Sequence, residues 1–210
     1  MRAISMKRRK LIEGLVALPV LLRLLVVDTA HAHEEGDHSE HGAMAPRPLK
    51  RSMARYEVPD VTLTDANGKT VALRAALAED APLMLNFIFT SCTTICPVMS
   101  GVFAQVQSRF AQTGKRVRMI SISIDPEHDT PERLMAYAKN FSAGPDWVML
   151  TGRLGDSVAI QHAFDAYRGD KMNHEPITYL RAGTSQPWLR LEGLASADEL
   201  VKEYNGLTRQ

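Results

Sequence analysis

The segment 83–99 holds both cysteines of the chain and constrains the fold more than any other stretch. It starts with an apolar run, residues 83–89, whose aromatic and branched side chains predict a buried strand. A short turn leads into a predicted helix from about residue 97 to 112, with a proline in its first turn, where proline is favoured. Cys92 and Cys96 are therefore expected at a strand-to-helix junction.

The spacing of the two cysteines predicts that they act together. Residues four apart on a helix share one face, with Cα atoms about 6 Å apart, which is within the span of a disulfide. Cys92 and Cys96 can thus pair with each other as a redox couple or hold a metal ion together. A helix N-terminus also favours thiolate over thiol. The alternative is that both are small buried hydrophobic residues.

Composition indicates one domain with a tail and argues against a nucleic-acid partner. The chain has 210 residues, of which 45% are hydrophobic and 23% charged, enough for one substantial core. Of its 25 Lys and Arg residues, six lie in residues 1–32, together with two of the 24 acids. The remainder therefore has an excess of about three acids, which is unfavourable for binding phosphates.

Residues 1–32 are predicted to be an export signal. A basic stretch at 2–10 precedes an apolar stretch at 11–27, and Ala30-His31-Ala32 is typical of a cleavage site. An uncleaved membrane anchor is the alternative, and Arg8-Arg9 partly fits a twin-arginine signal. We therefore expect an exported protein, periplasmic or anchored to the inner membrane with its domain facing the periplasm. Two neighbouring cysteines in such a protein favour a redox or metal pair over a disulfide scaffold.

Residues 33–55 are expected to form a disordered, histidine-rich linker, because they are polar and without periodicity. Their histidines could collect Cu(II) or Zn(II) weakly, or the segment could be a solvated tether. The globular domain is expected at 56–210.

Hydrophobic periodicity and turn signals predict an α/β domain with a thioredoxin-like fold: a mixed central sheet, helices on both faces and an N-terminal β-hairpin. The expected elements are a hairpin around Asn67-Gly68, strands at 83–89, 117–124, 147–150, 177–181 and 188–191, a helix at 97–112 with Val98, Val102, Val106 and Phe110 inward, and helices capped by Thr130, Asp156 and the Ser196/Glu199 capping box. Functional groups in such sheets gather beyond the carboxyl ends of the strands, where Cys92 is expected.

Copper fits the cysteine pair better than zinc, which normally takes four ligands. A site that also admits Cu(II) usually adds an imidazole, and the domain offers His128, His162 and His174. His162 lies within a predicted helix and His128 in the loop after the second buried strand. His174 is the best candidate, because its loop could fold over the thiols; the alternative is an ordinary loop histidine. Met99 and Met172 flank the site and could add soft contacts.

Three motifs surround these residues: Phe89-Thr-Ser-Cys92-Thr-Thr-Ile-Cys96-Pro97, Ser123-Ile-Asp125-Pro-Glu-His-Asp129-Thr-Pro131, and His174 followed by Tyr179-Leu180. Together they resemble the Sco (SenC/PrrC) family of exported, thioredoxin-fold copper proteins, from about residue 58 to 207. The resemblance implies that Cys92, Cys96 and His174 are the copper ligands, for Cu(I) and Cu(II). Asn173 departs from the family, which commonly has an acid there. Asp125 and Asp129 are interpreted as a structural turn and helix cap.

The resemblance also implies a function. Family members help assemble the binuclear copper centre of cytochrome c oxidase, either by delivering copper or by reducing the acceptor's cysteines. We therefore predict a metallochaperone that binds one copper per chain. Its expected partners are the copper-bearing oxidase subunit or another cuproprotein acceptor, and a thiol reductant protein.

Two enzymatic or sensory alternatives stay open. One is a periplasmic thiol-disulfide oxidoreductase or redox sensor that uses the Cys92/Cys96 pair, and the other is a peroxiredoxin-like reductase. The three-residue gap differs from the two-residue gap of thioredoxin, and His174 has no role in simple disulfide exchange.

Overall fold

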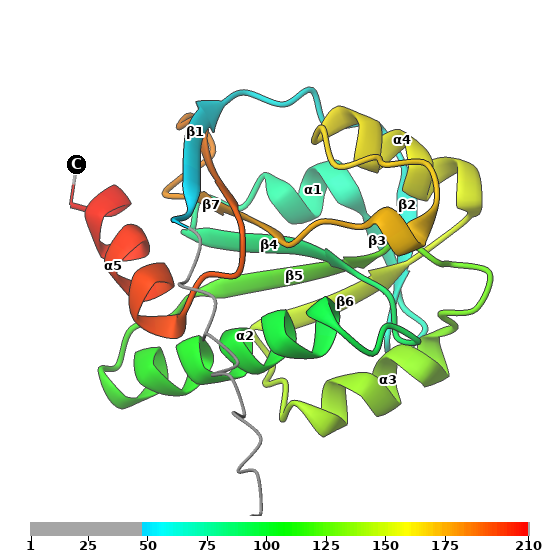
Figure 1. The fold of residues 1–210 in the computed structure, drawn as a ribbon, viewed down its shortest axis with the longest axis horizontal. Helices are drawn as coiled ribbons and strands as arrows, with labels where there is room; N and C mark the ends of the chain where they lie inside the picture. The colour runs from blue at the N-terminus through cyan, green and yellow to red at the C-terminus, as the bar shows by residue number, and fades with distance from the viewer. Residues whose placement is uncertain (1–47, 210) are drawn as a thin grey trace, which may run out of the picture. The chain divides into compact units, whose positions relative to one another are not determined.

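The structure is a computed structural model that describes residues 48–209 (Figure 1). The predicted export signal and most of the predicted linker lie outside the described residues. The elements are β1 (Lys50–Ala54), β2 (Thr62–Asp65), β3 (Thr70–Ala72), α1 (Leu73–Leu77), β4 (Leu83–Ile88), α2 (Ile95–Gln112), β5 (Arg118–Ser123), α3 (Pro131–Asn140), β6 (Trp147–Thr151), α4 (Leu154–Ala163), the 3-10 helix η1 (Lys171–Asn173), β7 (Ile177–Arg181), β8 (Trp188–Glu192) and α5 (Ala197–Leu207).

The strands form one eight-stranded mixed sheet in the order β1-β8-β7-β4-β5-β6-β2-β3. β4 pairs with β5 in parallel and with β7 antiparallel, so it lies inside the sheet. Helices α1 and α4 cover one face, and α2 and α3 cover the other (Figure 1). The predicted mixed sheet with helices on both faces and an N-terminal hairpin is confirmed.

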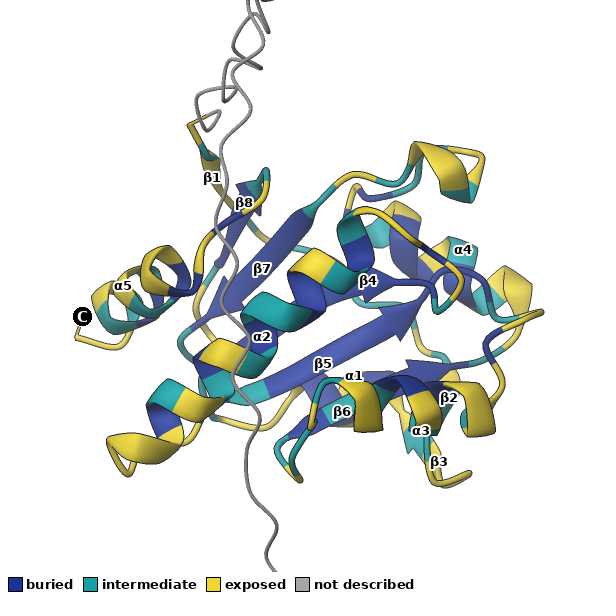
Figure 2. Cartoon of the chain, turned by 60° about the horizontal axis from the view of Figure 1, so that its bottom comes forward, coloured by how far each residue is buried: buried dark blue, intermediate teal, exposed yellow. Residues whose placement is uncertain are grey.

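β4 is the central strand, and all six of its side chains are buried. Figure 2 shows β4, β5 and β7 as a continuous buried surface beneath α2. A strand with neighbours on both edges and helices on both faces is buried along its whole length, which explains the nearly continuous hydrophobic run in the sequence. Its one polar residue, Asn86, accepts a hydrogen bond from the Ser121 hydroxyl through Oδ1. The carboxyl end of β4 leads into the turn that carries Cys92.

The buried face of α2 matches the predicted one only in part: Val106 and Phe110 are buried as expected, but Val98 near the start of the helix is not. Val98 was expected to face inward but is 48% exposed, whereas Met99 and Phe103 are 5% and 0% exposed. Phe103 packs against Trp147, with ring centroids 5.7 Å apart. A phenylalanine buries more apolar area than a valine, so the face that includes Phe103 turns towards the sheet.

Helix-capping predictions were mostly right. Thr130 caps α3 by accepting a hydrogen bond from the backbone N–H of Arg133, and Ser196 and Glu199 form the expected capping box of α5. The predicted cap of α4 was wrong. Its N-cap is Arg153, and Asp156 lies inside the first turn, where an acid also stabilises the helix dipole.

The predicted boundary between linker and domain was also wrong. β1 (Lys50–Ala54) lies within the segment expected to be disordered and pairs antiparallel with β8. Four of its five side chains are exposed, so its pairing depends on the backbone and leaves no hydrophobic pattern in the sequence. The ordered domain therefore includes Lys50. No helix within residues 48–209 is long and apolar enough to cross a membrane.

Candidate dithiol and metal site

The two cysteines lie in contact at the carboxyl end of β4. Cys96 is in the first turn of α2, and its backbone N–H points at the sulfur of Cys92, with an N···Sγ distance of 3.4 Å. Cys92 precedes the helix and donates its own N–H to the carbonyl of Phe89. The expectation that both cysteines share a helical face therefore fails for Cys92, although the sulfurs remain neighbours. The two sulfurs are not joined by a disulfide.

The pKa values of the two thiols are shifted in opposite directions. Burial alone would raise the pKa of Cys92, but hydrogen bonds from Cys96 and Thr94 stabilise the thiolate and bring its pKa below the ordinary value. Burial raises the pKa of Cys96 strongly, and the negative charges of Cys92 and Asp129 raise it further. Cys92 is 9% exposed and Cys96 is 0% exposed. Cys92 is thus the reactive sulfur, and Cys96 lies behind it.

Asp129 holds the loop that carries Cys92. This carboxylate is fully buried and accepts hydrogen bonds from the Thr90 N–H at 3.1 Å, the Thr90 hydroxyl at 2.5 Å and the Ser123 hydroxyl at 2.6 Å. The structural interpretation of Asp129 as part of a turn is confirmed, since its N–H donates to the carbonyl of Asp125. The cap of the following helix is Thr130, not Asp129.

Asp125 holds the loop that carries His174. Its carboxylate contacts the Lys171 ammonium at 2.5 Å and Nδ1 of His128 at 3.0 Å. Burial alone would raise the pKa of Asp125, but Lys171 and His128 outweigh it and lower the pKa. Lys171 also lies over the ring of Phe89, 5.7 Å from its centroid. The Asp125–Asp129 turn therefore anchors both loops of the candidate site.

His174 packs against Phe89. Its Nε2 is 3.0 Å from the carbonyl oxygen of Phe87, and its ring meets the Phe89 ring edge-on, with centroids 6.4 Å apart. Because a carbonyl only accepts, Nε2 carries the proton, and Nδ1 keeps a free lone pair. Burial lowers the pKa of His174, which favours the neutral ring that a metal requires.

The structure brings the cysteines together but leaves His174 short of them. Within residues 48–209, no group of three His, Cys, Asp or Glu side chains is close enough to hold a metal ion. His128 is paired with Asp125, and the exposed His162 stacks on Tyr167. Of the two methionines that were expected to flank the site, Met99 is buried and Met172 is 75% exposed.

Sequence reasoning missed Lys171, Thr90 and Ser123, which hold the loops in place. The spacing of the two acids in the turn 125–129 was the available signal. This spacing indicates that the carboxylates of Asp125 and Asp129 can both accept hydrogen bonds, but it does not identify the residues that donate to them. Thr90 is 39 residues from Asp129 in the sequence, and Lys171 is 46 residues from Asp125. Only the tertiary structure brings these partners together.

The fold and site define a thioredoxin-like protein with a dithiol at the start of a helix. A family model described as SCO1/SenC matches residues 50–209, and the chain belongs to this family. The SCO1 protein homolog of Bacillus subtilis is 39% identical over 161 residues, covering 72% of this chain and 75% of that protein.

Comparison with solved structures also finds Sco proteins. BsSco, described as a member of the Sco family of cytochrome c oxidase assembly proteins with a disulfide switch, has a TM-score of 0.64 and 28% identity, covering 75% of this chain and 96% of its own. Arabidopsis thaliana ScoI with copper bound has a TM-score of 0.60, covering 71% of this chain and 96% of that one. At 24% identity it shows the fold alone.

Proposed function

We propose that this chain is an exported copper-binding metallochaperone. It would deliver copper to, or reduce the cysteines of, the binuclear copper centre of cytochrome c oxidase. The observation that carries the proposal is the contact between Cys92 and Cys96 at the end of β4, with His174 packed against the ring of Phe89. The relatives support it, since BsSco is described as an oxidase assembly protein and the Arabidopsis protein holds copper.

The donor set suits copper as cargo. The pKa of Cys92 is lowered, which makes it the easier of the two thiols to deprotonate, and Cys96 can join it when a metal ion replaces its proton. Two thiolates bind soft Cu(I), and an imidazole adds affinity for Cu(II). We propose Cys92, Cys96 and His174 as the ligands. For His174 to join the sulfurs, its loop must shift from the position in which Nε2 bonds to the Phe87 carbonyl.

Thiol-disulfide exchange is the second candidate, and the asymmetry of the two thiols favours it. The Cys92 thiolate would attack a partner disulfide, forming a mixed disulfide and releasing one partner thiolate. Cys96 would then attack Cys92 in that mixed disulfide, releasing the reduced partner and leaving a Cys92–Cys96 disulfide. Two electrons pass to the partner, and a thiol reductant protein would restore the dithiol.

The site of action would be outside the cytoplasm. Support for this comes from the signal-like residues 1–32 and from a structural relative in Bacillus anthracis that is described as a SCO1/SenC family lipoprotein. Either a cleaved signal or an uncleaved anchor would place the domain in the periplasm.

An anaerobic copper titration of the reduced protein, followed by mixing with the copper-bearing subunit of an oxidase, tests the proposal. We expect one copper per chain and its appearance on the subunit. Absence of copper binding by the reduced protein would refute the metallochaperone. Rapid disulfide reduction by copper-free protein, unaffected by His174→Ala, would establish the oxidoreductase instead.

A further inference from the structure

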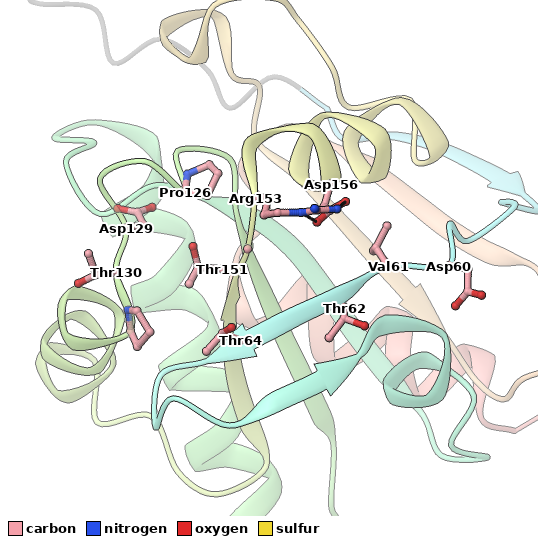
Figure 3. A pocket seen from close by; sticks show the side chains of 12 residues that line it. Asp60, Val61, Thr62, Thr64, Pro126, Asp129, Thr130, Thr151, Arg153 and Asp156 are labelled. Atoms are coloured by element: carbon pink, nitrogen blue, oxygen red, sulfur yellow. Dashed lines mark hydrogen bonds and ion pairs between the residues drawn. The ribbon is translucent and has the colours of Figure 1, made fainter.

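A polar cavity of about 600 Å³ lies next to the Asp125–Asp129 turn (Figure 3). Its walls come from β2, the end of β6 and the first residues of α3 and α4. The residues that matter for the argument are Asp60, Thr62, Thr130, Thr151, Arg153 and Asp156. Neither the cysteines nor His174 lines this cavity, although Asp129, which holds the Cys92 loop, forms part of its wall.

The cavity exists because β6 stops pairing with β2 too early. The two strands pair only at Thr64–Thr151 and Asp65–Leu150. At Gly152 the chain turns close to β2, where a Cβ atom would lie 2.6 Å from a methyl carbon of Leu63. Continued pairing would have placed Arg153 opposite Thr62. Instead, the chain leaves the sheet after Thr151 and enters α4, and the space beside Thr62 is left as a cavity.

Backbone groups of Thr62 face this space. Val61 directs its carbonyl towards β3, where it accepts from the N–H of Leu73 at 3.0 Å. In an antiparallel pair, consecutive residues direct their backbone groups to opposite sides. The N–H and C=O of Thr62 therefore point to the β6 side, where no strand residue among residues 48–209 opposes them.

The Thr151 hydroxyl is a second group that needs a partner. Thr151 is 5% exposed, and its Oγ1 has no hydrogen-bond partner among the described residues. Figure 3 shows this side chain inside the cavity, between Thr130 and Arg153. A buried hydroxyl without a partner costs about 1–3 kcal/mol, so a ligand that bonds to it is stabilised.

The start of α4 adds further donors. This ten-residue helix has Arg153 as its N-cap and no side-chain cap. Its first N–H groups therefore lack an intrahelical or capping acceptor. The Arg153 guanidinium is 88% exposed and pairs with Asp156 at 3.0 Å. Helix N-termini and arginine together favour an oxyanion.

The acids at the cavity restrict the charge of that anion. Asp129 already accepts hydrogen bonds from Thr90 and Ser123, and Asp156 is paired with Arg153. Asp60 is exposed and lies at the wall. Repulsion from these carboxylates disfavours a dianion, whereas a single negative charge can be balanced by Arg153 and the helix dipole.

We propose that this cavity is a binding site for a carboxylate group, on a small acid or at a peptide C-terminus. The carboxylate accepts hydrogen bonds from Thr151 Oγ1, Arg153 and the first N–H groups of α4. This inference is independent of the proposed copper function, because none of the proposed copper ligands (Cys92, Cys96 and His174) lines the cavity.

Titration of the full chain with sodium acetate, triglycine or triglycine amide, followed by amide NMR, tests the proposal. We expect saturable shifts of the amides of residues 151–157 with acetate and triglycine, and none with triglycine amide, which has no carboxylate. Shifts with triglycine but not acetate would assign the site to peptide termini. Stronger binding of inorganic phosphate, or saturation by the amide, would overturn it.

Variants distinguish a specific carboxylate site from nonspecific attraction to positive surface charge. Arg153→Ala and Thr151→Val should each weaken binding by roughly tenfold, the value of one strong hydrogen bond. Thr151→Val keeps the side-chain shape, and an unchanged thermal unfolding temperature of this variant would show that it is still folded. Asp156→Asn should tighten binding. Arg116→Ala, which removes another exposed arginine paired with an aspartate, should change nothing. Equal effects of Arg116→Ala and Arg153→Ala would contradict the site.

Discussion

The ammonium of Lys171 lies 2.5 Å from the carboxylate of Asp125, and this ion pair joins the loop of His174 to the turn after β5. Four residues further along the same turn, Asp129 binds the loop that leads to Cys92. The relative position of the two halves of the candidate site therefore depends on one short turn. Our predictions follow from this arrangement.

Lys171→Met should loosen the His174 loop without unfolding the protein. Hydrogen exchange of residues 170–175 should become faster. Because His174 must leave its present position to reach the sulfurs, Cu(II) affinity should rise, by roughly tenfold if the ion pair stabilises that position by about 1.4 kcal/mol. Alkylation of Cys92 should not change. Lys139→Met, in the last turn of α3, is the matched control. Unchanged exchange in the loop would show that Lys171 does not hold it.

Asp125→Asn should destabilise the protein in a pH-dependent way. The folded-state pKa of Asp125 is lowered, so its ionised form stabilises the protein above the ordinary pKa near 3.9. That contribution is lost as the pH falls through the folded-state pKa. Urea unfolding should show a difference of about 1–3 kcal/mol at pH 7 that shrinks below pH 4. A difference independent of pH would contradict this role.

Asp129→Asn should cost more, about 3–5 kcal/mol, because it weakens three hydrogen bonds to a buried carboxylate, each worth about 1.5–3 kcal/mol. An amide also places a donor against the hydroxyls of Thr90 and Ser123. Ser123→Ala removes one of these donors and should cost only about 1 kcal/mol. Chemical denaturation measures both. Equal costs would mean that the carboxylate is not the centre of this network.

The two cysteines should differ in reactivity. Iodoacetamide, followed by mass spectrometry of the peptides, should modify Cys92 at least about tenfold faster than Cys96, since Cys96 is fully buried and its pKa is raised. Equal rates would contradict the asymmetry on which the thiol-exchange mechanism depends.

Local signals in the sequence predicted much of the fold. The apolar run of β4 and the caps at Thr130 and Ser196 depend on neighbouring residues only, and all were confirmed. β1 was missed because its pairing with β8 uses backbone groups of a polar segment. Val106 and Phe110 were placed correctly on the buried face of α2, but Val98 was not, because Val98 and Met99 both fit helical spacing and only tertiary packing decides between them.

The candidate site was partly predictable. The junction of strand and helix placed Cys92 and Cys96 together, as the structure confirms. The ring of His174 could not be oriented from the sequence, because its contact with the Phe87 carbonyl joins residues 87 positions apart. Its role as the third ligand stays a prediction.

X-ray absorption spectroscopy of the Cu(II)-loaded protein tests the central claim most directly. Two sulfur neighbours near 2.3 Å and at least one imidazole nitrogen near 2.0 Å, by analogy with other thiolate and imidazole sites, are the expected shell. In His174→Ala the imidazole should disappear and stable Cu(II) binding should be lost, while Cu(I) binding is retained. An unchanged Cu(II) spectrum and affinity in His174→Ala would contradict the account.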